Sequence, residues 1–234
     1  KQILAEYAAV LRATGHYRET IPVYLTMIDG DGDKYTRHNL ALAYARTGNF
    51  RKAESTYRDL VNDHPGFLEA RSNLAGIYQL EGKLQQALDQ WTSILADHPD
   101  LYAAHFSIGE IKMKTDEYRK AMAHFSTAAK LRPDYAPPWL NFAAAAVRIG
   151  SCGRAAVALK RALASEGLDA EGYELLGDKF LEVFRKTEEQ ELLGLAITSW
   201  KKAQSLQPAN EGIHEKLERY EAMIEPGNGK ANPG

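Results

Sequence analysis

The chain has 234 residues, of which 44% are hydrophobic and 26% are charged, proportions that are ordinary for a well-packed soluble protein. Its formal net charge of −2 argues against a broad phosphate-binding surface and therefore against a nucleic-acid partner. No apolar run reaches the roughly 18 residues that a membrane-spanning helix needs, and the single cysteine, Cys152, excludes an internal disulfide bond. We expect a soluble protein of either the cytoplasm or a bacterial periplasm.

Prolines and glycines recur along the chain at a constant step of 34 residues. Pro65, Pro99 and Pro133 keep this step, and so do Gly48 and Gly82. A constant period of this size is typical of stacked units that each repeat one short motif. The helical pattern breaks at each glycine and stops at each proline, so each unit is expected to be a pair of helices.

Laying the chain on this step predicts six helical hairpins followed by one further helix. The hairpins are expected at residues 1–33, 34–67, 68–101, 102–135, 136–169 and 170–209, and the further helix at residues 210–225. Asn210 is a suitable N-cap for that helix, and its charged outer face suits the end of a stacked array. Residues 226–234 are predicted to be a disordered tail. No matching cap precedes the first hairpin, which suggests further repeats upstream of Lys1.

Small and bulky residues occupy matching positions of the six units. The eighth residue is Ala8, Ala41, Ala75, Gly109, Ala143 or Gly177, and the twentieth is Thr20, Ala53, Ala87, Ala121, Ala155 or, after an insertion, Ala196. The twenty-fourth is Tyr24, Tyr57, Trp91, Phe125, Leu159 or Trp200. Small residues allow the two helices of a hairpin to cross closely, and the bulky residues are expected to fill the space between hairpins.

These landmarks resemble the tetratricopeptide repeat (TPR), and the resemblance extends over residues 1–208. It implies an all-α fold, a right-handed α-α superhelical solenoid whose first helices line a concave groove. It also implies a non-catalytic scaffold that binds a peptide segment or a helix of a partner protein in that groove. The subclass that clamps a peptide carboxylate has Lys or Arg at the second and fifth positions of the first helices. This chain lacks them, so a partner of that type is disfavoured.

The sixth unit departs from the pattern because its second-helix landmarks arrive seven residues late. Seven residues are about two helical turns, so each helix of this hairpin could gain roughly one turn, with the connection near Thr187. The lengthened hairpin either has no functional consequence or projects toward a partner. In the second case Phe180, Phe184 and Leu193 would be partly uncovered.

The sequence contains no pattern that indicates catalysis, a metal site or a cofactor. The histidines do not form the HExxH pair of a zinc protease, and no phosphate-binding glycine motif is present. Asp29, Asp31 and Asp33 resemble the start of a calcium loop, but the twelfth position is Leu40, where a bidentate glutamate is required. We therefore expect no enzyme activity, no bound metal and no cofactor.

Asparagine occupies the sixth position of three first helices, at Asn39, Asn73 and Asn141. By helical periodicity this position shares a face with positions two, five, nine, twelve and thirteen, which line the groove in the TPR family. A carboxamide both donates and accepts hydrogen bonds, so these residues could hold the backbone of an extended peptide. Alternatively, asparagine is simply common at this position and contributes only to local packing. The sequence is equally consistent with both interpretations.

The same face changes character along the chain. The early units contribute His38 and Arg46. The last unit contributes acidic residues, which are also expected on a face that is simply exposed to solvent. The candidate groove residues of the fourth to sixth units are Phe106, Glu110, Met113, Leu140, Val147, Glu171, Glu174 and Asp178. Apolar residues on an open face commonly mark binding sites, so the middle of the groove is the strongest candidate.

Three functional hypotheses follow. The first is an interaction scaffold, whose partner places an apolar stretch over Phe106, Met113 and Leu140 and a basic stretch against the acidic end. The second is self-association through the lengthened sixth hairpin or the first helix. The third is that the chain is the TPR region of a larger multi-domain or envelope assembly or secretion protein.

Overall fold

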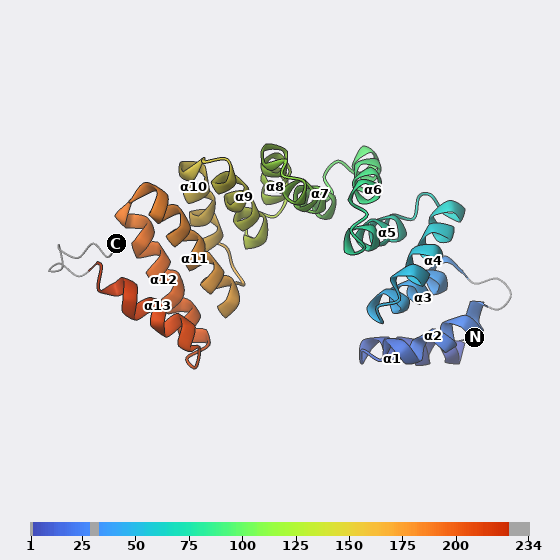
Figure 1. Cartoon of the computed structure of the whole chain (residues 1–234). Helices are drawn as coiled ribbons and strands as arrows, with labels where there is room; N and C mark the ends of the chain where they lie inside the picture. The colour runs from blue at the N-terminus through green and yellow to red at the C-terminus, as the bar shows by residue number, and fades with distance from the viewer. Residues whose placement is uncertain (1, 29–32, 225–234) are drawn as a thin grey trace. The chain divides into compact units, whose positions relative to one another are not determined.

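The structure is a computed structural model that describes residues 2–28 and 33–224. All regular structure in these ranges is helical (Figure 1), which confirms the all-α prediction. The first three hairpins consist of α1 (Gln2–Ala13) with α2 (Tyr17–Ile28), α3 (Lys34–Arg46) with α4 (Phe50–Asp63), and α5 (Leu68–Leu80) with α6 (Leu84–Asp97). The next three consist of α7 (Tyr102–Lys114) with α8 (Tyr118–Leu131), α9 (Ala136–Arg148) with α10 (Cys152–Leu163), and α11 (Ala170–Thr187) with α12 (Gln190–Leu206), and α13 (Glu211–Glu221) follows them.

Two predictions concern residues outside the described ranges. The predicted tail at residues 226–234 is one of them, and the calcium-like loop at Asp29 and Asp31 is the other. Asp33, the last acid of that loop, is described and is the N-cap of α3. Its carboxylate accepts hydrogen bonds from the backbone N–H groups of Tyr35 and Thr36 at 2.8 and 3.0 Å, an interaction that satisfies free donors in the first turn of a helix.

The chain divides into two compact units, residues 1–104 and residues 105–234, with the boundary inside α7. Within the units, first helices contact each other where α3 meets α5 and where α9 meets α11. Second helices also pack against the first helix that follows them, since α2 packs on α3, α4 on α5, α8 on α9 and α10 on α11. Both units therefore have the layering that stacked helical hairpins require.

The connections inside the hairpins show why the glycines recur. Gly48, Gly82 and Gly150 have φ angles of 79°, 74° and 74°, which lie in the left-handed region that favours glycine. The fourth hairpin has Asp116 at this place, with φ of 59°, and the sixth has Glu188, also with φ of 59°. The connection of the sixth hairpin thus lies next to Thr187, where the sequence predicts it.

The matched small and bulky positions form the core. All six bulky residues are buried, and the small residues at the eighth and twentieth positions are buried with them. At two hairpins the small residue has to be glycine, because a Cβ added at Gly109 would lie 2.6 Å from a ring carbon of Phe125, and one added at Gly177 would overlap the indole of Trp200. The helices of these hairpins therefore approach each other more closely than an alanine would allow.

The structure corrects one expectation about the lengthened sixth hairpin, namely that its apolar side chains would be partly uncovered. Its helices α11 and α12 have 18 and 17 residues, compared with 12 to 14 in the other hairpins, so both are lengthened as predicted. However, Phe180 and Leu193 are fully buried and Phe184 is half-buried. The additional turns pack against each other and extend the core of residues 105–234, rather than presenting apolar side chains to solvent.

Candidate functional site

A cavity of about 350 Å³ lies at the N-terminal ends of α9 and α11. We call it the α9–α11 cavity. Two predicted groove residues, Leu140 and Asn141, line it together. Its rim includes Tyr135 and Leu175, which are 45% and 46% exposed. Large apolar side chains exposed beside a cavity are a common feature of ligand-binding surfaces, and the sequence analysis did not single out either of these two residues.

Local sequence determines the shape of this cavity. Pro137 and Pro138 occupy the first turn of α9, where proline has a suitable φ and its missing N–H is not needed. Asp169 caps α11 by accepting a hydrogen bond from the N–H of Gly172 at 2.8 Å. Glu166 also lines the cavity, and the exposed Glu171 neighbours Gly172 in the first turn of α11. The rim is thus apolar on the α9 side and acidic near the start of α11.

The remaining apolar candidates lie deeper than the sequence indicates. Phe106 and Met113 on α7 are half-buried against the core, and the Phe106 ring lies 5.7 Å from the ring of Phe125, in an edge-to-face arrangement. Glu110, on the same helix, is also half-buried. Val147 is only 5% exposed, and its place in the groove was predicted wrongly. It belongs to the core of residues 105–234, because α9 packs against α8 and α10 and also contacts α11.

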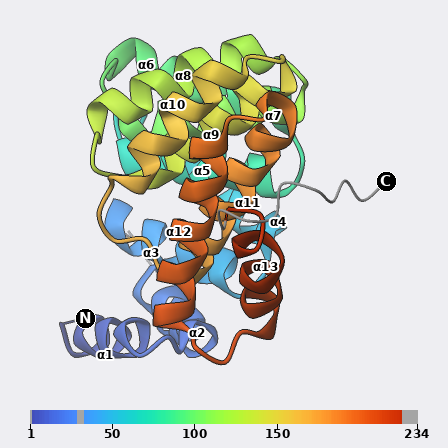
Figure 2. The same cartoon turned by 90° about the vertical axis from the view of Figure 1, so that its left-hand side faces the viewer.

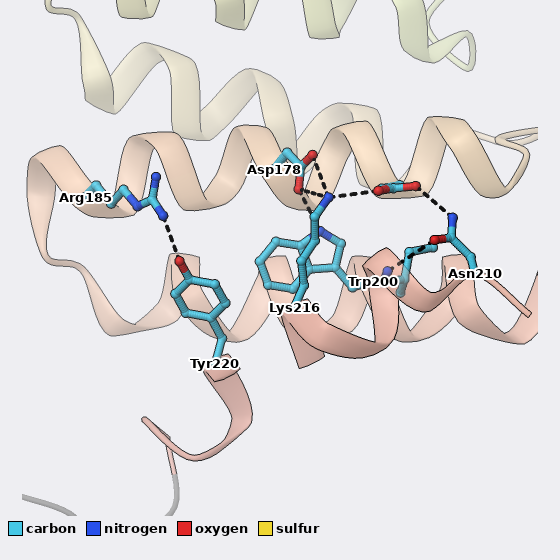
Figure 3. A network of polar contacts seen from close by, with 8 residues as sticks. Asp178, Arg185, Trp200, Asn210, Lys216 and Tyr220 are labelled. Carbon is cyan, nitrogen blue, oxygen red and sulfur yellow. Dashed lines mark hydrogen bonds and ion pairs between the residues drawn. The ribbon is translucent and has the colours of Figure 1, made fainter. Parts of the chain in front are cut away.

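The predicted acidic end of the groove is not open. Lys216 of α13 places its Nζ 2.8 Å from a carboxylate oxygen of Glu174 and 2.8 and 2.9 Å from those of Asp178 (Figure 3). Asn210 donates a hydrogen bond to Glu174 at 3.2 Å, and the indole N–H of Trp200 donates one to Asp178 at 3.1 Å. We call these five residues the Lys216 network. Of the three predicted acids, only Glu171 remains exposed.

Helix α13 covers this end because its own sequence gives it an apolar face. Asn210 caps the helix by accepting a hydrogen bond from the N–H of Ile213, as predicted. Ile213 and Leu217 are buried in the core of the last hairpin. Tyr220 lies with its ring 5.5 Å from that of Trp200, and Arg185 donates a hydrogen bond to its hydroxyl at 2.7 Å. Lys216 points toward α11 (Figure 3).

The Lys216 network leads to a prediction about pH. Burial opposes the charged form of Lys216, but hydrogen bonds from its ammonium group to Asp178 and Glu174 outweigh burial and raise its pKa above the usual value. Because the pKa of Lys216 is higher in the folded state than in the unfolded state, its charged form stabilises the fold. This stabilisation is complete below the unfolded pKa of about 10.4 and is lost as the pH rises through the folded pKa.

We therefore expect Lys216→Met to lower the free energy of unfolding at pH 7 by about 1–2 kcal/mol, a reduced figure because Asp178 is partly exposed. The difference from the wild type should shrink as the pH rises above the unfolded lysine pKa of about 10.4. Thermal melts at pH 7, 9 and 11 measure it. Lys130→Met, at an exposed lysine of α8, is the control and should change little at any pH. A difference that persists unchanged at pH 11 would contradict the charge-based origin of this stabilisation.

In residues 1–104 the predicted groove residues are spread over several environments. Asn39 lines a cavity of about 230 Å³ together with Arg12. The ring of His38 lies 5.7 Å from that of Tyr57 and 5.4 Å from that of Phe67, and burial lowers the pKa of His38.

The other two candidates in residues 1–104 differ in exposure. Arg46 is exposed, with its guanidinium 5.9 Å from the ring centroid of Tyr17, and Asn73 is half-buried near Tyr57. His38 and Asn73 are therefore less accessible than their positions in the repeat imply.

Over the described ranges, no group of three or more His, Cys, Asp or Glu side chains could hold a metal ion. No helix there is long and apolar enough to cross a membrane. Cys152 is half-buried at the start of α10.

The tetratricopeptide repeat family model matches residues 38–91 and 81–136. Solved TPR structures share the fold of nearly the whole chain. A TPR protein from Parabacteroides merdae aligns with 94% of this chain and 84% of its own, at 20% identity and a TM-score of 0.66. The chain therefore has the fold of tetratricopeptide-repeat proteins, and residues 38–136 match that repeat in sequence.

Two further structures resemble a smaller share of this chain. A thermophilic TPR protein from Thermus thermophilus aligns with 81% of this chain and 100% of its own, at 18% identity and a TM-score of 0.56. MamA from Desulfovibrio magneticus aligns with 69% and 92%, at 14% identity and a TM-score of 0.64. Comparison with curated proteins gives no match. The TPR fold in general serves as a non-catalytic scaffold for protein–protein interaction.

Proposed function

We propose that this protein binds a segment of a partner protein, and that the α9–α11 cavity receives an apolar side chain of that segment. The observation that carries the proposal is the pairing of the cavity with two exposed apolar residues, Tyr135 and Leu175. Asn141, in the cavity lining, can donate to and accept from the backbone of an extended segment. Such a lining suits a peptide that is recognised through one anchor residue and through its main chain.

The charges near the cavity specify the partner further. Glu166 lies in the lining and Glu171 is exposed nearby, whereas Glu174 and Asp178 are already paired with Lys216. A segment with Lys or Arg close to its apolar anchor would complement the two available carboxylates. The basic part of the partner therefore belongs beside the start of α11, and not at the end of the groove that the sequence suggested.

Selection of random 12-residue peptides displayed on phage tests this proposal. Enriched peptides should combine a bulky apolar residue with a neighbouring Lys or Arg. Tyr135→Ala combined with Leu175→Ala should weaken a selected peptide at least tenfold, roughly 1.4 kcal/mol, with an unchanged circular dichroism spectrum because both side chains are exposed. Leu206→Ala removes an equally exposed leucine outside the cavity and should leave affinity unchanged. Equal affinity of the wild type and the double variant would remove this cavity from the binding site.

Self-association is a second candidate, which the exposed face of α1 favours. Ile3, Tyr7 and Val10 are 82%, 53% and 60% exposed. The matching residues of the second hairpin, Thr36, Leu40 and Ala43, are buried, as are those of the next two hairpins. Helix α1 thus exposes the face that the repeats otherwise bury, and a hairpin of a second copy would cover it.

Sedimentation velocity over a range of concentrations tests self-association. The wild type should form dimers or larger species as concentration rises, and Tyr7→Glu should abolish them, because a charge would be buried in the contact. Leu206→Glu, at an exposed residue of α12, should leave association unchanged. A wild-type protein that remains monomeric at all concentrations would remove this candidate.

A further inference from the structure

Helices α8 and α10 both pack on α9 (Figure 2). Two cavities are lined by residues of these helices. One, of about 580 Å³, is lined by residues of α8, the α9–α10 connection and Arg154, and the other, of about 300 Å³, is lined by residues of all three helices and again by Arg154. Since the two share Arg154, they adjoin each other, and we call them together the α8–α10 trough. None of its lining residues belongs to the α9–α11 cavity.

One end of the trough is apolar. Val157 is 61% exposed there, and the matching residues of the earlier hairpins are Pro22, Ser55, Asp89 and Ala123. Trp139 lies beside it with its indole N–H already donated to the carbonyl oxygen of Pro133 at 3.1 Å, so the ring offers a ligand apolar surface only.

The fourth position of the unit varies between hairpins, from Leu4 in the first to Trp139 in the fifth and Tyr173 in the sixth. In the second and third hairpins that position is Arg37 or Arg71, and each pairs with an aspartate of its own hairpin at 2.6 Å. The packing of the repeat therefore does not require an apolar residue at the position of Val157 or of Trp139.

The other end of the trough is cationic. Arg119 and Arg154 are exposed, and no carboxylate in the described part of the chain lies within ion-pair distance of either. Arg154 places its guanidinium 5.3 Å from the ring centroid of Phe142. Both arginines occupy the first turn of a helix. No acidic residue stands in the first turn of α10, and Glu117, the N-cap of α8, is already paired with Lys112 and Lys120. The helix dipoles thus add to the positive potential at this end.

We propose that the α8–α10 trough is a second protein-binding site, and that it takes an acidic segment of a partner with one bulky apolar side chain. The apolar side chain would lie on Val157 and Trp139, and a carboxylate would pair with Arg119 and Arg154. Along α8 the trough runs from Arg119 to Ser126, which is about 10 Å at 1.5 Å per residue. In an extended segment this distance corresponds to about three residues. The ligand would thus have Asp or Glu about three residues from Leu or Phe.

Synthetic ten-residue peptides with blocked ends test this site by fluorescence anisotropy. One peptide contains a leucine and two aspartates, and the midpoint of the two aspartates lies three residues from the leucine. Its matched control has asparagines in place of the two aspartates. The aspartate peptide should bind at least tenfold tighter, and the preference should shrink as salt is raised because the charges are exposed. Equal binding of the two peptides, or no binding of either, would overturn the proposal.

Variants of the protein locate the bound peptide. Arg119→Gln with Arg154→Gln should weaken the aspartate peptide at least tenfold, and Val157→Asn should weaken both peptides. Lys130→Gln with Lys186→Gln removes the same charge from exposed lysines outside the trough and should change affinity less than twofold. Tyr135→Ala with Leu175→Ala should have no effect. Loss of binding in this last variant would instead place the acidic peptide at the α9–α11 cavity, and unchanged binding in the arginine variant would exclude the trough.

Discussion

Replacing Trp200 with alanine is expected to lower the free energy of unfolding of residues 105–234 by about 3–5 kcal/mol. The side chain is fully buried in the last hairpin, and it connects three helices. Its indole lies against Gly177 of α11, donates a hydrogen bond to Asp178, and contacts the ring of Tyr220 of α13 in a tilted arrangement. Its removal would leave a cavity and would also withdraw the surface on which α13 rests.

Hydrogen exchange of the α13 amides, together with thermal melts, measures both effects. In Trp200→Ala the amides of α13 should exchange much faster, whereas in Leu159→Ala, the matching change in the fifth hairpin, they should stay protected. Leu159 is also fully buried, so its loss should cost about 2–5 kcal/mol without touching α13. Protection of α13 that survives the loss of Trp200 would contradict the role assigned to the indole.

The repeat step predicts the hairpins well because local sequence determines them. The glycines at the connections need the left-handed conformation, and the bulky residue at the twenty-fourth position needs a small residue opposite it. Such requirements recur in every unit, so they appear as a period in the sequence. The six first helices begin at or next to the residues that the 34-residue step predicts. The capping helix is also visible, because Asn210 and the apolar spacing after it are local signals.

The candidate site is less predictable because it depends on contacts between helices that the period does not describe. Helical spacing tells which side of a helix a residue occupies, but not which other helix covers that side. Val147 shares a face with Leu140 and is nevertheless buried. Glu174 and Asp178 share a face with Glu171 and are paired with Lys216, which lies 42 and 38 residues further along the chain. The groove-binding roles of the three asparagines remain predictions.

A second substitution in the last hairpin tests the close helix crossing. Gly177→Ala should destabilise residues 105–234 by about 1–3 kcal/mol, because the added methyl group would overlap the fully buried indole of Trp200 and neither helix can move freely. Gly194→Ala is the matched control within the same hairpin. A Cβ there meets nothing within 4 Å, so alanine should stabilise α12 by about 0.5–1 kcal/mol. Thermal melts of the two variants should therefore shift in opposite directions.

The fifth hairpin provides the compensating change. Its eighth position is Ala143 and its twenty-fourth is Leu159. Both side chains are buried, so this pair packs in the core without glycine at the eighth position. Gly177→Ala combined with Trp200→Leu reproduces this pair in the sixth hairpin. Since the leucine removes the ring that the new methyl group would strike, the double variant should be more stable than the sum of the two single effects predicts, by about 0.5–3 kcal/mol. Strict additivity would show that the alanine destabilises through the backbone of α11 and not through contact with Trp200.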